Sequence, residues 1–303
     1  MRLVEKYCYK YYMQMIKIAS AQQCLLGEGP VWDARHQVIC WIDILKGLIY
    51  MLHPGTGVLK TIATNRVLGA ICLCDDGHFL GAFQDGFGFI DRHTGAVNMV
   101  ADPERHLPGN RFNDGKCDPS GRFWAGTMSL TEAPAAGTVY MLGHALSISH
   151  KIEGTTISNG MAWSPDQRFF YFIDTPARSV VRYDYDQSGE ISGLKTVIEF
   201  MPEDGFPDGM TIDTAGMLWI AHWGGWQVSR WDPATGEKLL SISLPVANAT
   251  SCTFGGEKLQ DLYITTARKD LTAKELSEQP LAGSLFVWEN SGYEGMLAVA
   301  YKK

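Results

Sequence analysis

The sequence has no long apolar run, no basic block and a modest share of charged residues. Nothing in its 303 residues approaches the ~18 uninterrupted apolar residues that a membrane-spanning helix requires. Lys and Arg number 26 against 33 Asp and Glu, a net charge of −7, and Lys302 and Lys303 are the nearest approach to a basic cluster. We therefore expect neither a membrane nor a nucleic acid as a partner.

Paired cysteines are also missing. The seven cysteines are odd in number and include no Cys-x-x-Cys pair, which argues against a disulfide framework. Near the N-terminus, Glu5, Lys6 and Lys10 interrupt any apolar core of a signal peptide. We expect a reduced, cytoplasmic protein, with residues 1–15 as an N-terminal extension outside the fold.

The sequence does contain a repeat, and it is rich in apolar residues (46%), aromatics (11%) and glycine (32 residues). Each copy has an apolar run, a tight turn and a second run of strand-forming residues, and the turns recur about every 42 to 49 residues. They begin at Asp33, Asp75, Asp118, Ser164, Asp213 and Gly255.

A second hairpin follows the first in each copy, and two hairpins per unit are typical of a propeller blade. The pattern predicts an all-β fold, a single six-bladed β-propeller over residues 16–303; two packed β-sandwiches would rarely show six copies in register. We expect residues 16–19 to complete the last blade and close the ring, and residues 272–278 to form a short helix in a loop.

The repeat places one residue of each copy at an equivalent position, five residues before each turn. Because the first strand of a blade lines the central channel, these residues should converge at one mouth. They are Glu28, Ala70, Asn113, Asn159, Asp208 and Thr250.

Four of these six side chains are carboxylates or amides, and glycines beside them would let a ligand approach the backbone. Such oxygen donors suit Ca²⁺, Mg²⁺ or Mn²⁺ and are acceptable to Zn²⁺, and without His or Cys they do not form a closed structural zinc site. Any single Asn-Gly or Asp-Gly could be only a turn. The shared offset of Glu28, Asn159 and Asp208 favours a central metal-binding channel.

Five motifs carry a resemblance to a known family. They are GEGPVWD, RFNDGKCDPSGRFWAGTM, SNGMAWSPD, FPDGMTIDTAGMLWIA and TSCTFGG. Together they resemble the sugar-lactonase family that includes regucalcin (senescence marker protein) and gluconolactonase. The resemblance implies one divalent metal ion held by Glu28, Asn159 and Asp208, with Asp208 also as general acid/base. It implies that Arg111 and Asn113 contact the substrate.

The activity that the resemblance implies is hydrolysis of a sugar lactone, such as gluconolactone, arabinolactone or xylonolactone, to the aldonic acid, with the metal as Lewis acid. A monomer or weak homo-oligomer is expected. Some animal members place a glutamate in the loop after Ala-Gly-Thr-Met; that position is Thr131 here, with Glu132 adjacent, so the substrate lid is undecided. The stretch from His222 to Trp226 looks more like bacterial sugar lactonases, in which a Trp rim could stack on a sugar face.

Three other functions are compatible with a propeller that has polar residues in its channel. One is a non-catalytic calcium-binding regulatory protein of the regucalcin type. Another is an arylesterase-like or phosphotriesterase-like hydrolase, with Asn113 as an added metal ligand. The third is a protein-interaction propeller, which the acidic channel argues against. We interpret His222 as a packed or surface residue, and Asp114, Lys116 and Asp118 as a solvated turn network.

Overall fold

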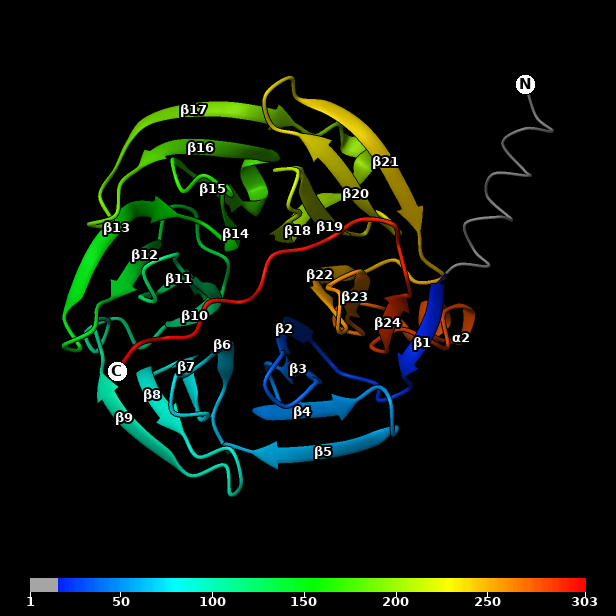
Figure 1. Cartoon of the computed structure of the whole chain (residues 1–303), viewed down its shortest axis with the longest axis horizontal. Helices are drawn as coiled ribbons and strands as arrows, with labels where there is room; N and C mark the ends of the chain where they lie inside the picture. The colour runs from blue at the N-terminus through cyan, green and yellow to red at the C-terminus, as the bar shows by residue number, and fades with distance from the viewer. Residues whose placement is uncertain (1–15) are drawn as a thin grey trace.

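The computed structural model describes residues 16 to 303, so the prediction of an extension over residues 1–15 lies outside the described residues. These residues form six four-stranded antiparallel sheets arranged in a ring (Figure 1). The predicted all-β, six-bladed propeller is therefore confirmed. In the described part of the chain no helix is long and apolar enough to cross a membrane.

Blades 1 to 3 follow the chain from the inner strand outward. Blade 1 contains β2 (Gly27–Asp33), β3 (Val38–Asp43), β4 (Leu48–His53) and β5 (Val58–Ala63). Blade 2 contains β6 (Leu68–Leu73), β7 (Phe79–Phe83), β8 (Gly86–Ile90) and β9 (Val97–Ala101). Blade 3 contains β10 (Asn110–Cys117), β11 (Phe123–Ser129), β12 (Gly137–Leu142) and β13 (Ile148–Thr155).

Blades 4 and 5 repeat this order, and blade 6 combines both ends of the described chain. Blade 4 contains β14 (Ser158–Trp163), β15 (Phe169–Asp174), β16 (Ser179–Tyr185) and β17 (Ile191–Glu199). Blade 5 contains β18 (Phe206–Ile212), β19 (Leu218–Trp223), β20 (Gln227–Asp232) and β21 (Glu237–Ser243). Blade 6 contains β22 (Ala249–Gly255), β23 (Asp261–Thr266), β24 (Leu285–Trp288) and β1 (Ile16–Ser20). Within residues 16–303, helical structure is limited to η1 (Thr175–Ala177), η2 (Pro202–Asp204) and α2 (Ala273–Glu278).

The first strand of the described chain closes the ring. β1 pairs antiparallel with β24, with Ile16 opposite Trp288 and Ile18 opposite Phe286. This pairing covers an edge that β24 would otherwise expose, and it confirms the predicted closure. The helix expected over residues 272–278 is also present as α2, capped by Thr272, whose side chain accepts a hydrogen bond from the Glu275 amide.

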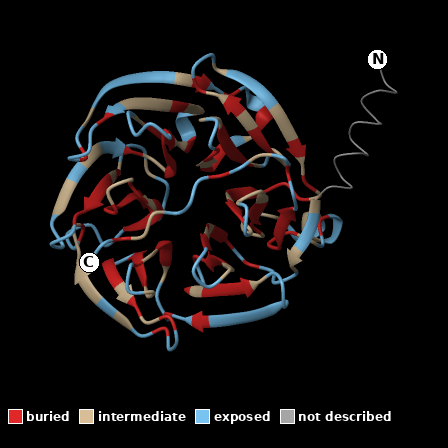
Figure 2. Cartoon of the chain, in the orientation of Figure 1, coloured by how far each residue is buried: buried red, intermediate tan, exposed pale blue. Residues whose placement is uncertain are grey.

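Burial falls from the centre of the ring to its rim. The inner strand β6 is almost wholly buried, whereas the outer strand β5 is almost wholly exposed (Figure 2). Inner strands of consecutive blades contact one another around the channel. Polar residues on an inner strand consequently lie in the most buried part of the molecule.

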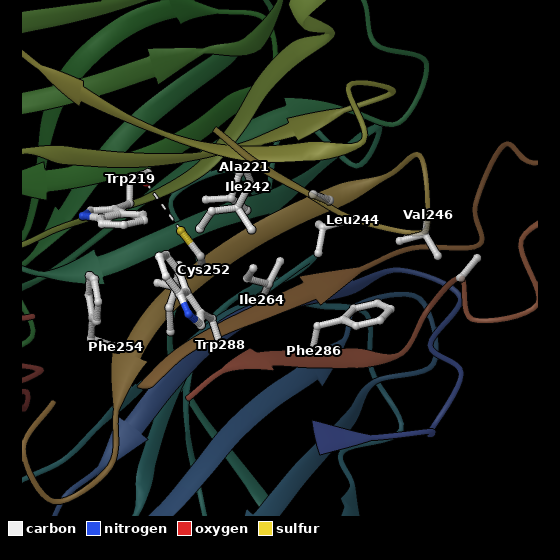
Figure 3. Packing of buried hydrophobic residues seen from close by; sticks show 14 residues of the cluster. Trp219, Ala221, Ile242, Leu244, Val246, Cys252, Phe254, Ile264, Phe286 and Trp288 are labelled. Atoms are coloured by element: carbon white, nitrogen blue, oxygen red, sulfur yellow. Dashed lines mark hydrogen bonds between the residues drawn. The ribbon is translucent and has the colours of Figure 1, made fainter. Parts of the chain in front are cut away.

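Six apolar clusters fill the spaces between neighbouring blades. In the cluster between blades 5 and 6, Trp219 packs against Phe254 and Trp288 (Figure 3). The Cys252 thiol donates a hydrogen bond to the Trp219 carbonyl over 3.5 Å, and burial raises its pKa to about 12. The cysteine is thus a small core residue and not a reactive thiol.

The C-terminal segment crosses the ring after β24 (red in Figure 1). Gly295 pairs with Asp213 of blade 5, and Tyr301 pairs with Cys74 beside blade 2. The Tyr301 hydroxyl, fully buried, donates to the Gly143 carbonyl over 2.7 Å. Because Asp213 and Cys74 follow the ends of their inner strands, this segment covers the channel end opposite the predicted mouth. The repeat gave no sign of this cover.

The prediction of a solvated network at Asp114, Lys116 and Asp118 is wrong. Asp118 is fully buried and accepts hydrogen bonds from Trp124 Nε1 (3.0 Å) and Arg122 Nε (2.7 Å). Asp114 is buried in the channel, and Lys116 Nζ donates to the Met210 carbonyl of blade 5 over 2.7 Å. The C-terminal segment and the neighbouring blades exclude solvent from this end of β10.

Candidate functional site

Each inner strand contains a β-bulge near the residue that the repeat singled out. In β2, for example, the pairing with β3 shifts between Glu28 and Val31, so the inner strand has one extra residue. The same shift occurs between Phe112 and Gly115, and in the other four inner strands. Bulges redirect side chains locally and are frequent beside functional sites. The same β-bulge, repeated in each inner strand, therefore directs the polar residues of different blades toward one mouth of the channel.

Glycines next to the polar residues allow the inner strands to approach one another. A Cβ atom at Gly160 would lie 2.8 Å from the Asp208 carbonyl oxygen, closer than real Cβ contacts. A Cβ atom at Gly209 would collide with the Ser251 side chain. These glycines accommodate the neighbouring strand, which differs from the expectation that they make room for a ligand.

The five residues predicted to form the site line one cavity of about 360 Å³ at the mouth. They are Glu28, Arg111, Asn113, Asn159 and Asp208, and they come from blades 1, 3, 4 and 5. Apolar side chains form much of the wall, namely Leu26, Met128, Ile157, Pro176, Phe206 and Trp223. The structure thus brings the predicted residues together, while their individual roles stay predictions.

Carboxylates accumulate in the buried floor of this cavity. Burial raises the pKa of Glu28 well above its ordinary value, and the charges of Asp208 and Asp114 raise it further. Burial and the Asp114 charge also raise the pKa of Asp208, whereas a hydrogen bond from Asn159 lowers it. Burial lowers the Arg111 pKa to about 10, although the Glu28 charge opposes this shift. A cation among these carboxylates would relieve their mutual repulsion.

Asn159 tests whether the residues fit a metal ion. Its Nδ2 donates to Thr175 Oγ1 over 2.9 Å, but its Oδ1 is buried without a hydrogen-bond partner. A buried carbonyl oxygen without a donor is costly, and a hard cation would satisfy it. No group of three His, Cys, Asp or Glu able to hold a metal occurs within residues 16–303. With Glu28 and Asp208, the donor set fits one divalent cation.

Arg111 and Asn113 form a fixed pair beside the carboxylates. Arg111 Nη1 donates to Asn113 Oδ1 over 2.8 Å and to the Phe112 carbonyl over 2.9 Å. Asn113 Nδ2 donates to the Ser158 carbonyl of the next blade over 2.9 Å. A metal ion would have to compete with the Arg111 guanidinium for Asn113 Oδ1. The hydrogen bond between the two residues therefore favours a role of Asn113 in substrate contact over a role as metal ligand.

The two candidates for a substrate lid, Thr131 and Glu132, differ in their position relative to the cavity. Glu132 lines the cavity, whereas Thr131 Oγ1 lies 3.0 Å from Ser129 Oγ in the same loop. Lys269 and Asp270 reach the same rim from the loop after β23. The sequence did not indicate them, because this loop lies outside the repeated hairpins.

Aromatic residues flank the mouth on one side. Trp223 lines the cavity and faces Phe206 across the β18–β19 pairing. Trp226, in contrast, is 43% exposed. His222 is fully buried, with Nε2 2.5 Å from Ser229 Oγ, so it is a packed residue as we expected.

Comparison with known proteins adds a family context. The family described as SMP-30/Gluconolactonase/LRE-like region matches residues 26–268. A Bacillus subtilis (strain 168) protein with the provisional name sugar lactone lactonase YvrE is 38% identical over 275 residues, or 90% of this chain and 94% of that protein. Regucalcin of Oryctolagus cuniculus is 35% identical over 297 residues, or 95% of this chain and 99% of that protein. A solved structure of regucalcin from Agrobacterium tumefaciens str. C58, described as a calcium-binding protein, has a TM-score of 0.90 at 29% identity, covering 94% of this chain and 97% of that chain.

Proposed function

The chain belongs to the SMP-30/gluconolactonase/LRE-like family, and from this membership we propose that it is a metal-dependent hydrolase that opens a sugar lactone to its aldonic acid. The observation that carries the proposal is the orphaned, buried Oδ1 of Asn159 in one cavity with Glu28 and Asp208. The Arg111–Asn113 pair adds polar groups that can hold hydroxyls beside these oxygens.

Glu28, Asn159 and Asp208 would hold one divalent cation, which is Ca²⁺, Zn²⁺, Mn²⁺ or Mg²⁺ on the chemistry of the donors. The bound ion would supply Lewis acidity toward the lactone carbonyl. The description of the Agrobacterium tumefaciens relative as calcium-binding supports Ca²⁺ as the first ion to test.

Asp208 is the proposed general acid/base. Its carboxylate accepts a proton from the attacking water as the new C–O bond forms, and it returns that proton to the ring oxygen as the lactone C–O bond breaks. Burial and the neighbouring Asp114 charge raise its pKa, and a cation held by the same carboxylate would lower it toward the ionised form that a base requires. Arg111 and Asn113 orient the sugar hydroxyls, and their mutual hydrogen bond fixes both before the substrate arrives.

A turnover assay tests this function. Gluconolactone, arabinolactone and xylonolactone are offered to protein treated with chelator and then supplied with each ion in turn, while acid release is followed at constant pH. We expect turnover to disappear with chelator and to return with at least one ion. Asp208→Asn should lower kcat by roughly 10²- to 10⁴-fold. Asp184→Asn, at an exposed aspartate on β16, is the matched control and should leave kcat unchanged.

Two results would contradict the proposal. Full activity in Asp208→Asn would remove that residue as the base. Failure of every lactone with every ion, while Ca²⁺ still raises the Tm, would favour the regulatory calcium-binding alternative, which has the same donor set.

A further inference from the structure

One ion pair joins two blades that lie opposite each other in the ring. Glu132 is in the loop between β11 and β12 of blade 3, and Lys269 is in the loop after β23 of blade 6. Figure 1 shows these two blades on opposite sides of the channel. Lys269 Nζ lies 3.9 Å from Glu132 Oε1, and both residues line the cavity. The pair therefore crosses the mouth above the floor residues.

Backbone contacts hold both partners in place. Glu132 has a φ of +56°, uncommon for a residue with a side chain, and its amide donates to the Ser129 carbonyl over 3.0 Å. The Lys269 amide donates to the Leu25 carbonyl over 2.8 Å, and its carbonyl accepts from Asn248 Nδ2 over 3.1 Å. The crossing is thus built into two ordered loops.

Two further contacts keep the Lys269 ammonium at the rim. Its Nζ lies 2.5 Å from Asp270 Oδ2 and 5.8 Å from the centre of the Trp223 ring. Its side chain is 31% exposed, so one side of it meets solvent and the other meets the cavity. Together with Glu132, these residues narrow the passage between bulk water and the floor.

The cavity of about 360 Å³ has ample room for a single-ring lactone, so access to it, rather than its volume, would select the substrate. A single-ring lactone and a few waters fit in that volume. A second ring attached to the lactone would have to emerge between Glu132 and Lys269 and would separate them.

We propose that Lys269 is a specificity-determining residue that, by crossing to Glu132 over the cavity, limits the substrate to a lactone of a single sugar ring. This inference rests on the proposed function for the identity of the substrate. It concerns the passage and not the chemistry, because the Lys269 ammonium contacts Glu132, Asp270 and Trp223 at the rim.

Kinetics with two substrates test whether the Lys269–Glu132 crossing excludes larger lactones, a role that we call the filter. The ratio of kcat/KM for cellobionolactone, a disaccharide lactone, to that for gluconolactone is measured for the wild type, Lys269→Ala and Glu132→Gln. We expect the ratio to rise roughly five-fold in Lys269→Ala and by a smaller factor in Glu132→Gln, since exposed ion pairs are weak. Added salt should raise the wild-type ratio and leave that of Lys269→Ala unchanged. The matched control is Lys274→Ala, which removes an exposed Lys274–Glu278 pair on α2 with the same 3.9 Å separation.

An alkylation assay tests the same filter without turnover. Ile157→Cys places a thiol on the cavity wall, and the native cysteines within residues 16–303 are buried. Its rates with iodoacetamide and with a bulky maleimide are compared with and without Lys269→Ala, and the parent protein gives the background. We expect Lys269→Ala to accelerate the bulky reagent several-fold relative to the small one.

The two assays separate failure of the filter from failure of the proposed function. If no lactone is turned over but Lys269→Ala accelerates only the bulky reagent, the proposed substrate fails and the filter stands. If Lys269→Ala changes neither the substrate ratio nor the ratio of alkylation rates, Lys269 is not the filter.

Discussion

Several buried side-chain atoms within residues 16–303 have no hydrogen-bond partner, and a comparison of Asn159 with His222 shows that their surroundings give this feature different meanings. Asn159 Oδ1 is unpartnered in a residue that lines the mouth cavity. His222 Nδ1 is unpartnered between strands, where Phe200 packs against the imidazole ring. A cation can reach the first atom but not the second. A buried polar atom without a hydrogen-bond partner therefore indicates a binding site only where a cavity lies beside that atom.

His222 should make stability depend on pH. Burial lowers its pKa from 6.5 to about 4, so between these values the unfolded chain binds a proton that the folded chain does not. The contribution of His222 to stability is accordingly complete above about pH 6.5 and is lost as the pH drops toward 4, by about 2 kcal/mol between pH 7 and pH 5, whereas the raised pKa values of Glu28 and Asp208 act in the opposite direction. Urea unfolding at the two pH values measures this difference.

The His222→Leu variant should lose most of that pH dependence, because it removes the titrating ring. His93→Leu, at an exposed histidine, is the matched control and should retain the wild-type dependence. An unchanged slope in His222→Leu would assign the pH effect to other groups.

Among the elements, the inner strands decide where the site forms. Each contains one extra residue relative to its neighbour in the sheet, and the shift occurs near the residue facing the mouth. Close approach of these bulged strands brings Asn159 of β14 near Asp208 of β18. The geometry of the site thus depends on small residues between blades as well as on the polar residues themselves.

Gly160→Ala tests this dependence. The added methyl group would lie 2.8 Å from both the Asp208 carbonyl oxygen and the Met210 Cβ, so the two strands must separate. We expect a loss of about 1–3 kcal/mol in the free energy of unfolding, measured in urea. Gly109→Ala, where an added Cβ atom meets nothing within 4 Å, is the control and should cost much less. Equal stability of the two variants would show that the strands separate without cost.

For the whole molecule, stability depends on closing the ring. β1 supplies the fourth strand of blade 6 and joins the start of the propeller to its end. Without it, β24 becomes an open edge and blade 6 has three strands.

Deletion of residues 1–20 should therefore lower the Tm, by about 5–10 °C on the size scaling of unfolding entropies. Deletion of residues 1–15 is the comparison, and the prediction that they lie outside the fold requires an unchanged Tm. Calorimetry measures both. If the two deletions have equal Tm values, β1 is dispensable for closure.

Local repetition explains why so much of the architecture could be predicted. The turns from Asp33 to Gly255 mark each hairpin within a few residues, and every inner strand ends at or just before one of them. The equivalent offsets of Glu28, Asn159 and Asp208 followed from the same periodicity, and the structure gathers these residues in one cavity. The prediction that Asp118 is solvated was wrong because it depended on a contact that is not local. A turn that looks solvent-exposed in the sequence is covered by another part of the chain.

The sequence by itself determined the number of blades, the strand that closes the ring and the polar residues that meet at the mouth, because each of these depends on a pattern that repeats along the chain. Only the tertiary structure decided that Lys269 faces Glu132 across the mouth, that the C-terminal segment covers the other end, and that Asn159 Oδ1 lacks a partner. These features join segments that are distant in the sequence, such as Glu132 and Lys269, or depend on the distance between neighbouring strands. No local pattern encodes such contacts, since they arise only when the blades pack into a closed ring.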